Sequence, residues 1–283
     1  MKRESKVSNY KEITDIPDKL KIVLPTSFDV IGDIALIKIP KELYPYKNKI
    51  SQAFLQTYKH IKTVCLSSPV SGELRIRDIE IIGGENKLET IHKEYGAKFK
   101  LDIKKVYFSP RLATERKRIA DLVKENEVII DMFTGVAPFP IVIAKHANPR
   151  IIYGIEKNKN AFFYAKENVK LNKLLDKIEI FNDDAKNVDK IFEDLNIKAD
   201  RIIMNLPFSA QNFFKKALMT CNSPSVIHYY DFLKDEEIED KIKILQEHAK
   251  VVGYNLDIER INKIKSYSPR EFYIGIDITA KKK

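Results

Sequence analysis

Four polar side chains stand where apolar stretches of the chain give way to turn-like sequence. Asp131 ends EVIID, Glu156 ends RIIYGIE, Asp183 closely follows KIEIF, and Asn205 ends DRIIMN. Ligands of open α/β sheets bind at the carboxyl ends of the strands, so these groups are expected at one edge of a sheet. Carboxylates and amides there can bind sugar hydroxyls and base edges, which predicts a site for a nucleoside-like molecule.

The segment DMFTGVAPF predicts the turn that receives this molecule. Gly135, behind Asp131 and Phe133, lets the backbone approach an adenosine-type ligand at a helix N-terminus. Glu156 follows about twenty residues later, where an acid can accept both ribose hydroxyls, and Asp183 is placed to meet the adenine edge. No phosphate-loop lysine follows the glycine, which disfavours a nucleoside triphosphate and favours S-adenosylmethionine. Taken singly, each acid could equally be a solvated loop residue or a helix cap.

The residues after Asn205 predict a stiff turn. Pro207 disfavours helix for the residue before it and lacks a backbone donor, so Asn205 is held at the strand end. The Asn205 amide can both donate and accept hydrogen bonds, and it is expected to border the bound cofactor at this edge of the sheet.

From about residue 126 onward, apolar strands alternate with helices. Strands are expected over 127–133, 150–156, 177–181, 200–205 and 225–232, and helices over 139–147, 160–173, 186–195 and 234–251. Two extended segments, 253–260 and 271–279, close the chain. Strands this apolar, separated by helices, predict βαβ units and a parallel sheet covered on both faces. Residues 105–283 are therefore predicted to form an α/β domain with a doubly wound, Rossmann-like sheet.

The first hundred residues show a different pattern. FDVIGDIALIKIP predicts a strand pair around Gly32, and KNKISQAFLQTYKHI has helical spacing. GELRIRDIEIIGG and KFKLDIKKVYF alternate with the period of half-exposed strands. These features predict a separate small α+β domain over residues 1–104, joined to the second domain without a flexible linker.

The chain is basic, with 50 Lys and Arg against 40 Asp and Glu, a net charge of +10. This favours a polyanionic partner such as nucleic acid, although lysine-rich solvated surfaces are common. The charged start lacks an apolar secretory core and no stretch approaches a membrane-spanning run, so a cytoplasmic protein without a membrane partner is expected. The two cysteines and five histidines show no ligand spacing, and neither a disulfide framework nor a metal site is expected.

Seven segments, in order, resemble the archaeal and eukaryotic tRNA (guanine-37-N1)-methyltransferase family. They are GELRIRDIEIIGGEN, TIHKEYG, DIKKVYFSPRLATERKRI, DMFTGVAPF, IIMNLP, VIHYY and IKSYSPREFYIGIDI. The resemblance implies a class I S-adenosylmethionine domain behind a small domain that helps to hold tRNA. It departs from the family's loop at Thr134, where an alanine-like residue is usual, and at Ala137, where a glycine is usual. The chain is expected to be a short form without the extra N-terminal domain of longer members.

The reaction that this resemblance implies is methylation of N1 of the guanosine just 3′ of the anticodon. N1 must lose its proton, and the charge that spreads to O6 must be stabilised. The resemblance implies that Glu115 is the base and that the Asn205 amide orients the purine edge, by donating to it and accepting from it. Pro207 and Phe208 are then expected to wall the base pocket. From spacing alone, Glu115 could instead form a helical ion pair with Arg111 or Arg118.

Arg75 is implied as the cation at O6. From spacing alone, Arg75 and Arg77 could equally form a surface ion-pair ladder with Glu73. Tyr107 and Arg111 lie in the segment between the two domains and are expected to hold an unpaired base that leaves the loop.

The preferred interpretation is a tRNA guanosine-37 N1-methyltransferase that acts as a monomer on the anticodon stem-loop. Two alternatives use the same cofactor. One methylates C7 of the imidazo-guanosine intermediate of wyosine synthesis, and the other transfers the aminocarboxypropyl chain, which the NLP segment disfavours. A tRNA-binding protein without catalysis and an NAD-dependent oxidoreductase are the other classes, and the incomplete glycine pattern disfavours the second.

Overall fold

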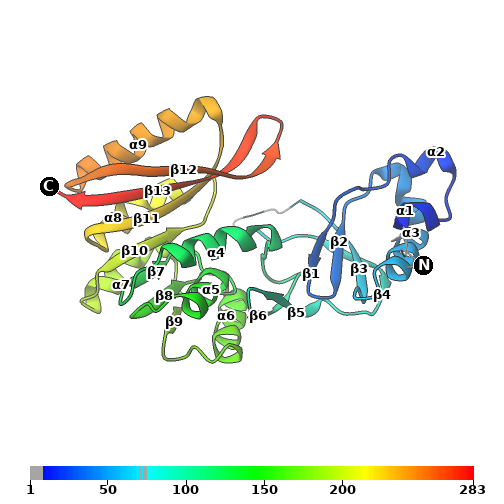
Figure 1. The fold of residues 1–283 in the computed structure, drawn as a ribbon, viewed down its shortest axis with the longest axis horizontal. Helices are drawn as coiled ribbons and strands as arrows, with labels where there is room; N and C mark the ends of the chain where they lie inside the picture. Colours follow the sequence, from blue (N-terminus) through cyan, green and yellow to red (C-terminus); the bar gives the residue numbers. More distant parts are fainter. Residues whose placement is uncertain (1–8, 70–71, 73–74) are drawn as a thin grey trace, which may run out of the picture. The chain divides into compact units, whose positions relative to one another are not determined.

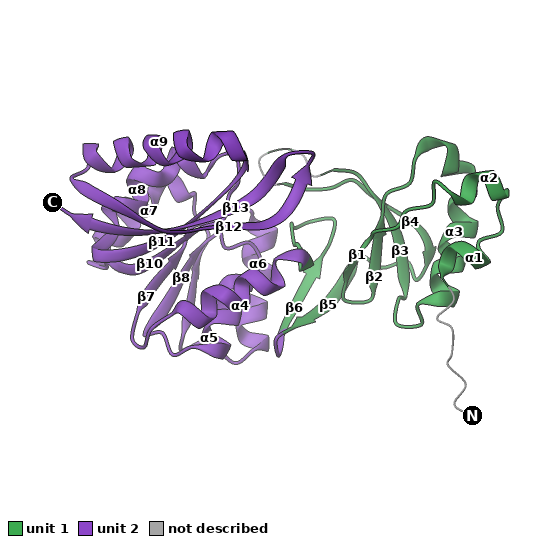
Figure 2. Cartoon of the chain, turned by 45° about the horizontal axis from the view of Figure 1, so that its top comes forward, with its two compact units in different colours: residues 1–94, 98–110 green, residues 95–97, 111–283 purple. Residues whose placement is uncertain are grey.

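The computed structural model describes residues 9–69, 72 and 75–283. They fall into two compact units, one within residues 1–94 and 98–110, the other of residues 95–97 and 111–283 (Figure 2). The units change over between Pro110 and Arg111, and the domain boundary predicted after residue 104 stays a prediction.

The second unit is built on a seven-stranded sheet of order β12-β13-β11-β10-β7-β8-β9 (Figure 1). Its strands are β7 (Val128–Asp131), β8 (Ile151–Ile155), β9 (Ile178–Phe181), β10 (Ala199–Met204), β11 (Cys221–Lys234), β12 (Tyr254–Ser268) and β13 (Glu271–Lys282). Strands β7 to β11 pair in parallel, whereas β13 runs antiparallel to both β11 and β12. The strand order reverses between β7 and β10, where ligands of such sheets bind. The predicted doubly wound α/β fold is confirmed, with an antiparallel hairpin added at one edge.

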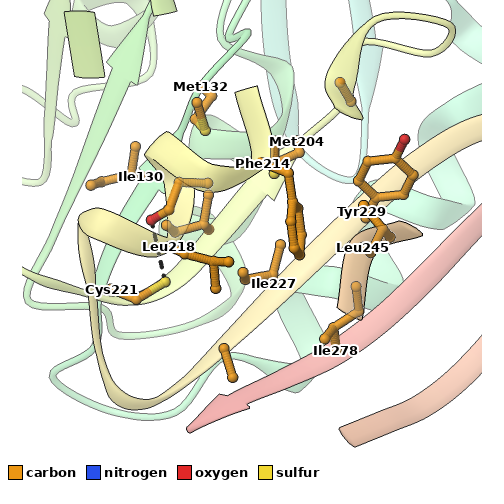
Figure 3. Close-up of a cluster of buried hydrophobic side chains, with 14 of the residues drawn as sticks. Ile130, Met132, Met204, Phe214, Leu218, Cys221, Ile227, Tyr229, Leu245 and Ile278 are labelled. Carbon is orange, nitrogen blue, oxygen red and sulfur yellow. Dashed lines mark hydrogen bonds between the residues drawn. The ribbon is translucent and has the colours of Figure 1, made fainter. Parts of the chain in front are cut away.

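Helices cover both faces of this sheet (Figure 2). They are α4 (Ala113–Leu122), α5 (Pro138–His146) and α6 (Lys159–Leu171) on one face, and α7 (Val188–Asp194), α8 (Phe214–Met219) and α9 (Ile238–Val251) on the other. Side chains from β7, β10, β11 and β13 pack on α8 and α9 in one apolar cluster (Figure 3). Burial on both faces explains why these strands are apolar almost throughout.

The first unit contains a four-stranded sheet of order β1-β2-β3-β4 and a two-stranded sheet. The strands are β1 (Asp29–Ile31), β2 (Ile34–Ile37), β3 (Thr63–Ser67), β4 (Ile79–Gly84), β5 (Glu89–Glu94) and β6 (Ala97–Asp102), and the helices are α1 (Tyr10–Ile13), α2 (Asp18–Lys21) and α3 (Lys47–Thr57). Gly32 forms the β1–β2 turn at φ +59°, and a Cβ there would lie 2.1 Å from the Thr90 hydroxyl, so only glycine fits.

Two strands of the first unit are shorter than predicted. The strand expected from residue 72 begins only at Ile79, because Arg75 stands in a turn at φ +54° and donates its N–H to the Gly72 carbonyl. The strand expected over 98–108 ends at Asp102, whose side chain accepts the N–H of Lys104 at 2.9 Å and starts a turn. Conversely, β12 extends eight residues beyond its predicted end, to Ser268, and forms a long hairpin with β13.

Within the described ranges, no helix is both long and apolar enough to cross a bilayer. Over the same residues, no group of three or more His, Cys, Asp and Glu side chains is arranged to hold a metal ion.

Candidate active site

The turn between β7 and α5 is shaped by two residues with positive φ. Gly135 has φ +56°, and a Cβ there would meet no atom within 4 Å, so the space beside the turn is open. Ala137 has φ +65° just before α5, a conformation that costs an alanine about 1 kcal/mol relative to the usual region. Glycine adopts this conformation without that cost. The turn thus has open space beside Gly135, and binding of an adenosine-type ligand there stays a prediction.

Asp131 is buried at the end of β7, where this turn begins. One of its oxygens accepts the Thr134 hydroxyl at 3.1 Å, and the other accepts the N–H of Phe133 at 3.3 Å. Burial raises the pKa of Asp131 to about 7, although both hydrogen bonds oppose this shift. Thr134, the other departure from the family's loop, thus fixes the Asp131 carboxyl.

Because of Asp131, we expect the protein to lose stability as the pH rises toward 7. Its pKa in the fold lies above 3.8, so the folded state keeps a proton that the unfolded chain releases. The stabilising contribution is full below about pH 4 and is lost as the pH rises through about 7. In thermal melts, the Tm of Asp131→Asn relative to that of the wild type should therefore rise between about pH 5 and pH 8, because asparagine cannot ionise. An equal difference in Tm at both pH values would contradict this.

Glu156 follows β8, and its carboxylate contacts the β7–α5 turn. Its carboxylate accepts the N–H of Gly135 and the N–H of Asn158, each at 2.7 Å. Burial raises the pKa of Glu156, and these two bonds oppose the shift. Each oxygen keeps a lone pair with which to accept a hydroxyl. The structure thus brings Glu156 together with Gly135, and the contact of Glu156 with a ribose stays a prediction.

Two further residues of the predicted cofactor site flank this turn less directly. Asp183 follows β9. Its Oδ1 accepts two hydrogen bonds, from the N–H of Asp184 at 2.7 Å and from the side-chain amide of Asn187 at 2.8 Å. The Phe133 ring packs edge-on against Phe213 at 5.2 Å. Their contacts with a cofactor stay predictions.

Glu115 lies in the first turn of α4 and is only 3% exposed. Arg118 donates to both of its oxygens, at 2.7 and 2.9 Å. The Tyr230 hydroxyl donates to Oε1 at 2.8 Å, and the Asn262 amide donates to Oε2 at 3.3 Å. The helical ion pair that spacing allowed is therefore present, and together the four bonds fix the orientation of the carboxylate.

A chain of hydrogen-bonded ionisable side chains, most of them buried, extends from Glu115 into the sheet. It runs through Arg118, Asp277, His228, Arg201 and Glu127. Arg201 donates to His228 Nε2 at 2.7 Å, so His228 carries its proton on Nδ1 and donates it to Asp277 at 2.6 Å. Burial alone would raise the pKa of Asp277, but the hydrogen bonds from His228 and Arg118 hold it well below its usual range.

Asn205 is connected to Glu115 by two tyrosines. The Tyr273 hydroxyl donates to Asn205 Oδ1, which leaves the NH₂ group of Asn205 to donate elsewhere. Tyr273 stacks on Tyr230, with ring centroids 5.7 Å apart and ring planes 13° apart, and Tyr230 donates to Glu115. The two residues predicted for chemistry in this unit are thus linked through two side chains, and their roles stay predictions. Sequence reasoning missed both tyrosines, although they lie in VIHYY and IKSYSPREFYIGIDI.

The turn after Asn205 exposes an aromatic ring. Pro207 is buried, whereas Phe208 is 59% exposed and has φ +74°. The N–H of Phe208 is held by the Asp231 carboxylate at 2.8 Å. The predicted turn is therefore present, and the role of Pro207 and Phe208 at a base stays a prediction.

In the first unit, Arg75 lies over the ring of Tyr107, with the guanidinium carbon 4.8 Å from the ring centroid. Arg75 Nε is buried and has no hydrogen-bond partner within the part of the chain that the structure describes. Arg75 stands in a turn and not on a strand, and Glu73, the acid of the ion-pair ladder that spacing allowed, lies outside the described residues. Arg111, at the start of the second unit, is exposed.

Known proteins match this chain over most of its length. Residues 11–87 match the TYW2 N-terminal domain, and residues 90–257 match the TRM5/TYW2 methyltransferase domain. The tRNA (guanine(37)-N(1))-methyltransferase Trm5b of Pyrococcus abyssi is 41% identical over 272 residues, which are 95% of this chain and 79% of that protein. The tRNA(Phe) (4-demethylwyosine(37)-C(7)) aminocarboxypropyltransferase of Methanocaldococcus jannaschii is 36% identical, over 88% of this chain and 96% of that protein. A solved complex of aTrm5 and tRNALeu superposes with a TM-score of 0.85 at 36% identity, over 97% of this chain and 78% of that one.

Proposed function

This chain belongs to the TRM5/TYW2 methyltransferase family, and from this we propose that it methylates N1 of guanosine-37 in tRNA with S-adenosylmethionine as the donor. The observation that carries the proposal is the pairing of Glu115 and Asn205 through stacked tyrosines. This pairing holds a carboxylate and an amide donor in fixed positions, as N1 chemistry on guanine requires. One copy of the chain acts on one tRNA, in the cytoplasm.

S-adenosylmethionine supplies a methyl group that its sulfonium makes electrophilic. The β7–α5 turn, with Phe133 and Gly135, leaves open space for the adenosine, and Glu156 accepts the ribose hydroxyls. Asp183 meets the adenine edge, and Asp131 fixes the start of the turn. Asn205 borders the donor because β10 pairs with β7, which places their carboxyl ends side by side.

Glu115 accepts the N1 proton of the target guanine. All four of its hydrogen bonds come from protein groups, so the base must replace one of them. The bond from Asn262 is the longest at 3.3 Å, and it is the one most easily replaced by an N–H of the base. The NH₂ group of Asn205 then stabilises the charge on O6. Arg111, Pro207 and Phe208 of the second unit hold the displaced base. In the first unit, we assign Arg75 the role of a cation for O6 and Tyr107 that of a base contact, on the resemblance to the family.

Arg75→Lys should slow the methyl-transfer step about 100-fold while tRNA affinity stays nearly unchanged, because a point charge replaces a planar pair of donors. Arg77→Lys is the matched control, since Arg77 lies near the same Tyr107 ring at 6.0 Å. Single-turnover rates and salt-dependent tRNA binding measure the two effects. If Arg75→Ala weakens only tRNA binding, with a smaller salt slope, Arg75 is a phosphate contact instead.

The proposed function is tested with two tRNA transcripts that differ only in guanosine or adenosine at position 37. After reaction with S-adenosylmethionine and digestion to nucleosides, N1-methylguanosine is expected from the guanosine transcript alone. Equal methylation of both transcripts, or none with the cofactor bound, would contradict the proposal.

A second candidate is action on the tricyclic wyosine-type base at the same position. The similarity to the aminocarboxypropyltransferase of Methanocaldococcus jannaschii favours testing it. Transfer to C7 of that base, of a methyl group or of the aminocarboxypropyl chain, uses the same cofactor and the same base pocket. Reaction of tRNA that carries the tricyclic base, followed by mass analysis of the nucleoside, separates the two products.

A further inference from the structure

Two exposed aromatic rings meet beside the candidate site in the second unit. Phe208 is 59% exposed and Tyr267 is 55% exposed, and both pack on Phe232, which is 7% exposed. The ring centroids of Phe208 and Tyr267 lie 4.8 and 4.1 Å from that of Phe232. We call Phe208, Phe232 and Tyr267 the aromatic platform. Phe232 is the buried member, and more than half of each of the Phe208 and Tyr267 side chains is exposed.

The exposed position of Phe208 is held against a backbone preference. A bulky residue with φ +74° is an outlier, and such outliers persist only where the surroundings impose them. Here the Asp231 carboxylate accepts the N–H of Phe208, and Asp231 is itself bound by Tyr229 at 2.9 Å and by Lys241 at 3.0 Å. A buried anchor thus keeps an apolar ring in solvent, which points to a ligand for that ring.

The hairpin that carries Tyr267 is cationic toward its tip. Between residues 260 and 272 the β12–β13 hairpin, orange to red in Figure 1, has four cations and one acid: Arg260, Lys263, Lys265, Arg270 and Glu271. The Lys263 ammonium lies 4.4 Å from the centroid of the Phe272 ring and pairs with Asp235 at 2.6 Å. Aromatic faces flanked by cations are the composition of sites for single-stranded nucleic acid, where bases stack and phosphates are neutralised.

The platform is continuous with the residues that we place at the target base. Phe232 packs on Tyr273 at 5.0 Å, and Tyr273 donates to Asn205. A nucleotide bound on the platform is therefore next to the guanosine at Asn205. When an enzyme takes one base out of a stack, its neighbour loses a stacking partner, and an aromatic surface can replace it.

We propose that the aromatic platform stacks the nucleobase adjacent to the target guanosine in the tRNA loop. The inference rests on the proposed function, because it takes the target to be a loop guanosine. The platform adds a second recognition point, which reads an unpaired neighbour of the target by its π-face and not by its sequence.

Tyr267→Ala should raise the Kd for tRNA about tenfold or more, as loss of one base–aromatic stack does. Its affinity for S-adenosylhomocysteine and its rate at saturating tRNA should stay close to wild type. Tyr267→Phe should bind as the wild type does, and Tyr267→Leu should resemble the alanine variant, since leucine is apolar but not planar. Tyr44→Ala, which removes a 53% exposed tyrosine in the first unit, is the matched control. Thermal melts exclude unfolding as the cause.

The direct readout uses tRNA with the fluorescent base 2-aminopurine on either side of position 37. Binding to the wild type should quench one of the two probes, and Tyr267→Ala should restore its fluorescence. Binding of Tyr267→Ala with wild-type Kd and wild-type fluorescence at both positions would overturn the proposal, and would leave a protein or lipid as the partner of the rings. Because neither readout needs methyl transfer, a protein that binds tRNA but forms no N1-methylguanosine would refute the proposed function separately.

Discussion

Glu115→Gln should slow methyl transfer to guanosine-37 by about 100- to 10,000-fold, the range found when a general base is removed. Glutamine has nearly the same shape and can still accept hydrogen bonds from Arg118 and Tyr230, but it cannot take the proton from guanine N1. The affinities for S-adenosylhomocysteine and tRNA should therefore change little. Single-turnover rates at saturating enzyme measure the chemical step without product release.

Glu127→Gln is the matched control for this experiment. Glu127 is also largely buried and also binds an arginine through both oxygens, with Arg201 at 2.7 and 2.9 Å. It lies at the opposite end of the buried chain of charges from Glu115. Glu127→Gln should lower the free energy of unfolding but leave the single-turnover rate close to wild type. Equal slowing in both variants, or no slowing in Glu115→Gln, would remove Glu115 from the chemistry.

Arg118→Ala should lower the free energy of unfolding by about 3–5 kcal/mol, because it leaves two buried carboxylates without their shared cation. These carboxylates are Glu115 and Asp277, which Arg118 binds at 2.7 Å each. Lys117→Ala, on the same helix, removes only an exposed ion pair and should cost about 0.5 kcal/mol or less. Urea unfolding of the two variants gives the comparison, and equal losses would contradict the structural role of Arg118.

The same variant has an expected pH dependence. The pKa of Asp277 in the fold lies below its usual 3.8, so its stabilising contribution is present above about pH 4 and is lost as the pH falls further. Arg118→Ala removes one of the two groups that lower this pKa. Acid unfolding of Arg118→Ala should therefore begin at a higher pH than that of the wild type. Coincident acid transitions would show that Asp277 depends on His228 alone.

Much of the second unit could be predicted because its signals are local. Strand, turn and helix alternate within short stretches, and residues such as Glu156 and Asn205 stand directly after apolar strands. The parallel arrangement then follows from the alternation, and it places all strand ends at one edge. The contact between Glu156 and Gly135 could be anticipated for this reason.

The connection between Glu115 and Asn205 could not be predicted in the same way. Tyr230 and Glu115 are 115 residues apart in sequence, and Arg118 and Asp277 are 159 apart, so no local pattern relates them. At Arg75 the local pattern predicts the wrong structure. Its segment alternates like a strand, but Arg75 stands in a turn with positive φ. Hydrophobic periodicity does not report this turn, which is held by a hydrogen bond from the Arg75 N–H to the Gly72 carbonyl.

The most direct test of the proposed function is to identify which group of S-adenosylmethionine is transferred to tRNA, and to which atom. Unmodified tRNA would be reacted with S-adenosylmethionine that carries one isotope in the methyl group and another in the carboxyl group, and the anticodon-loop fragment would be analysed by mass spectrometry. If the proposed function is correct, the methyl label alone enters the RNA, on N1 of guanosine-37. Entry of the carboxyl label, or a methyl group on any other nucleotide, would contradict it.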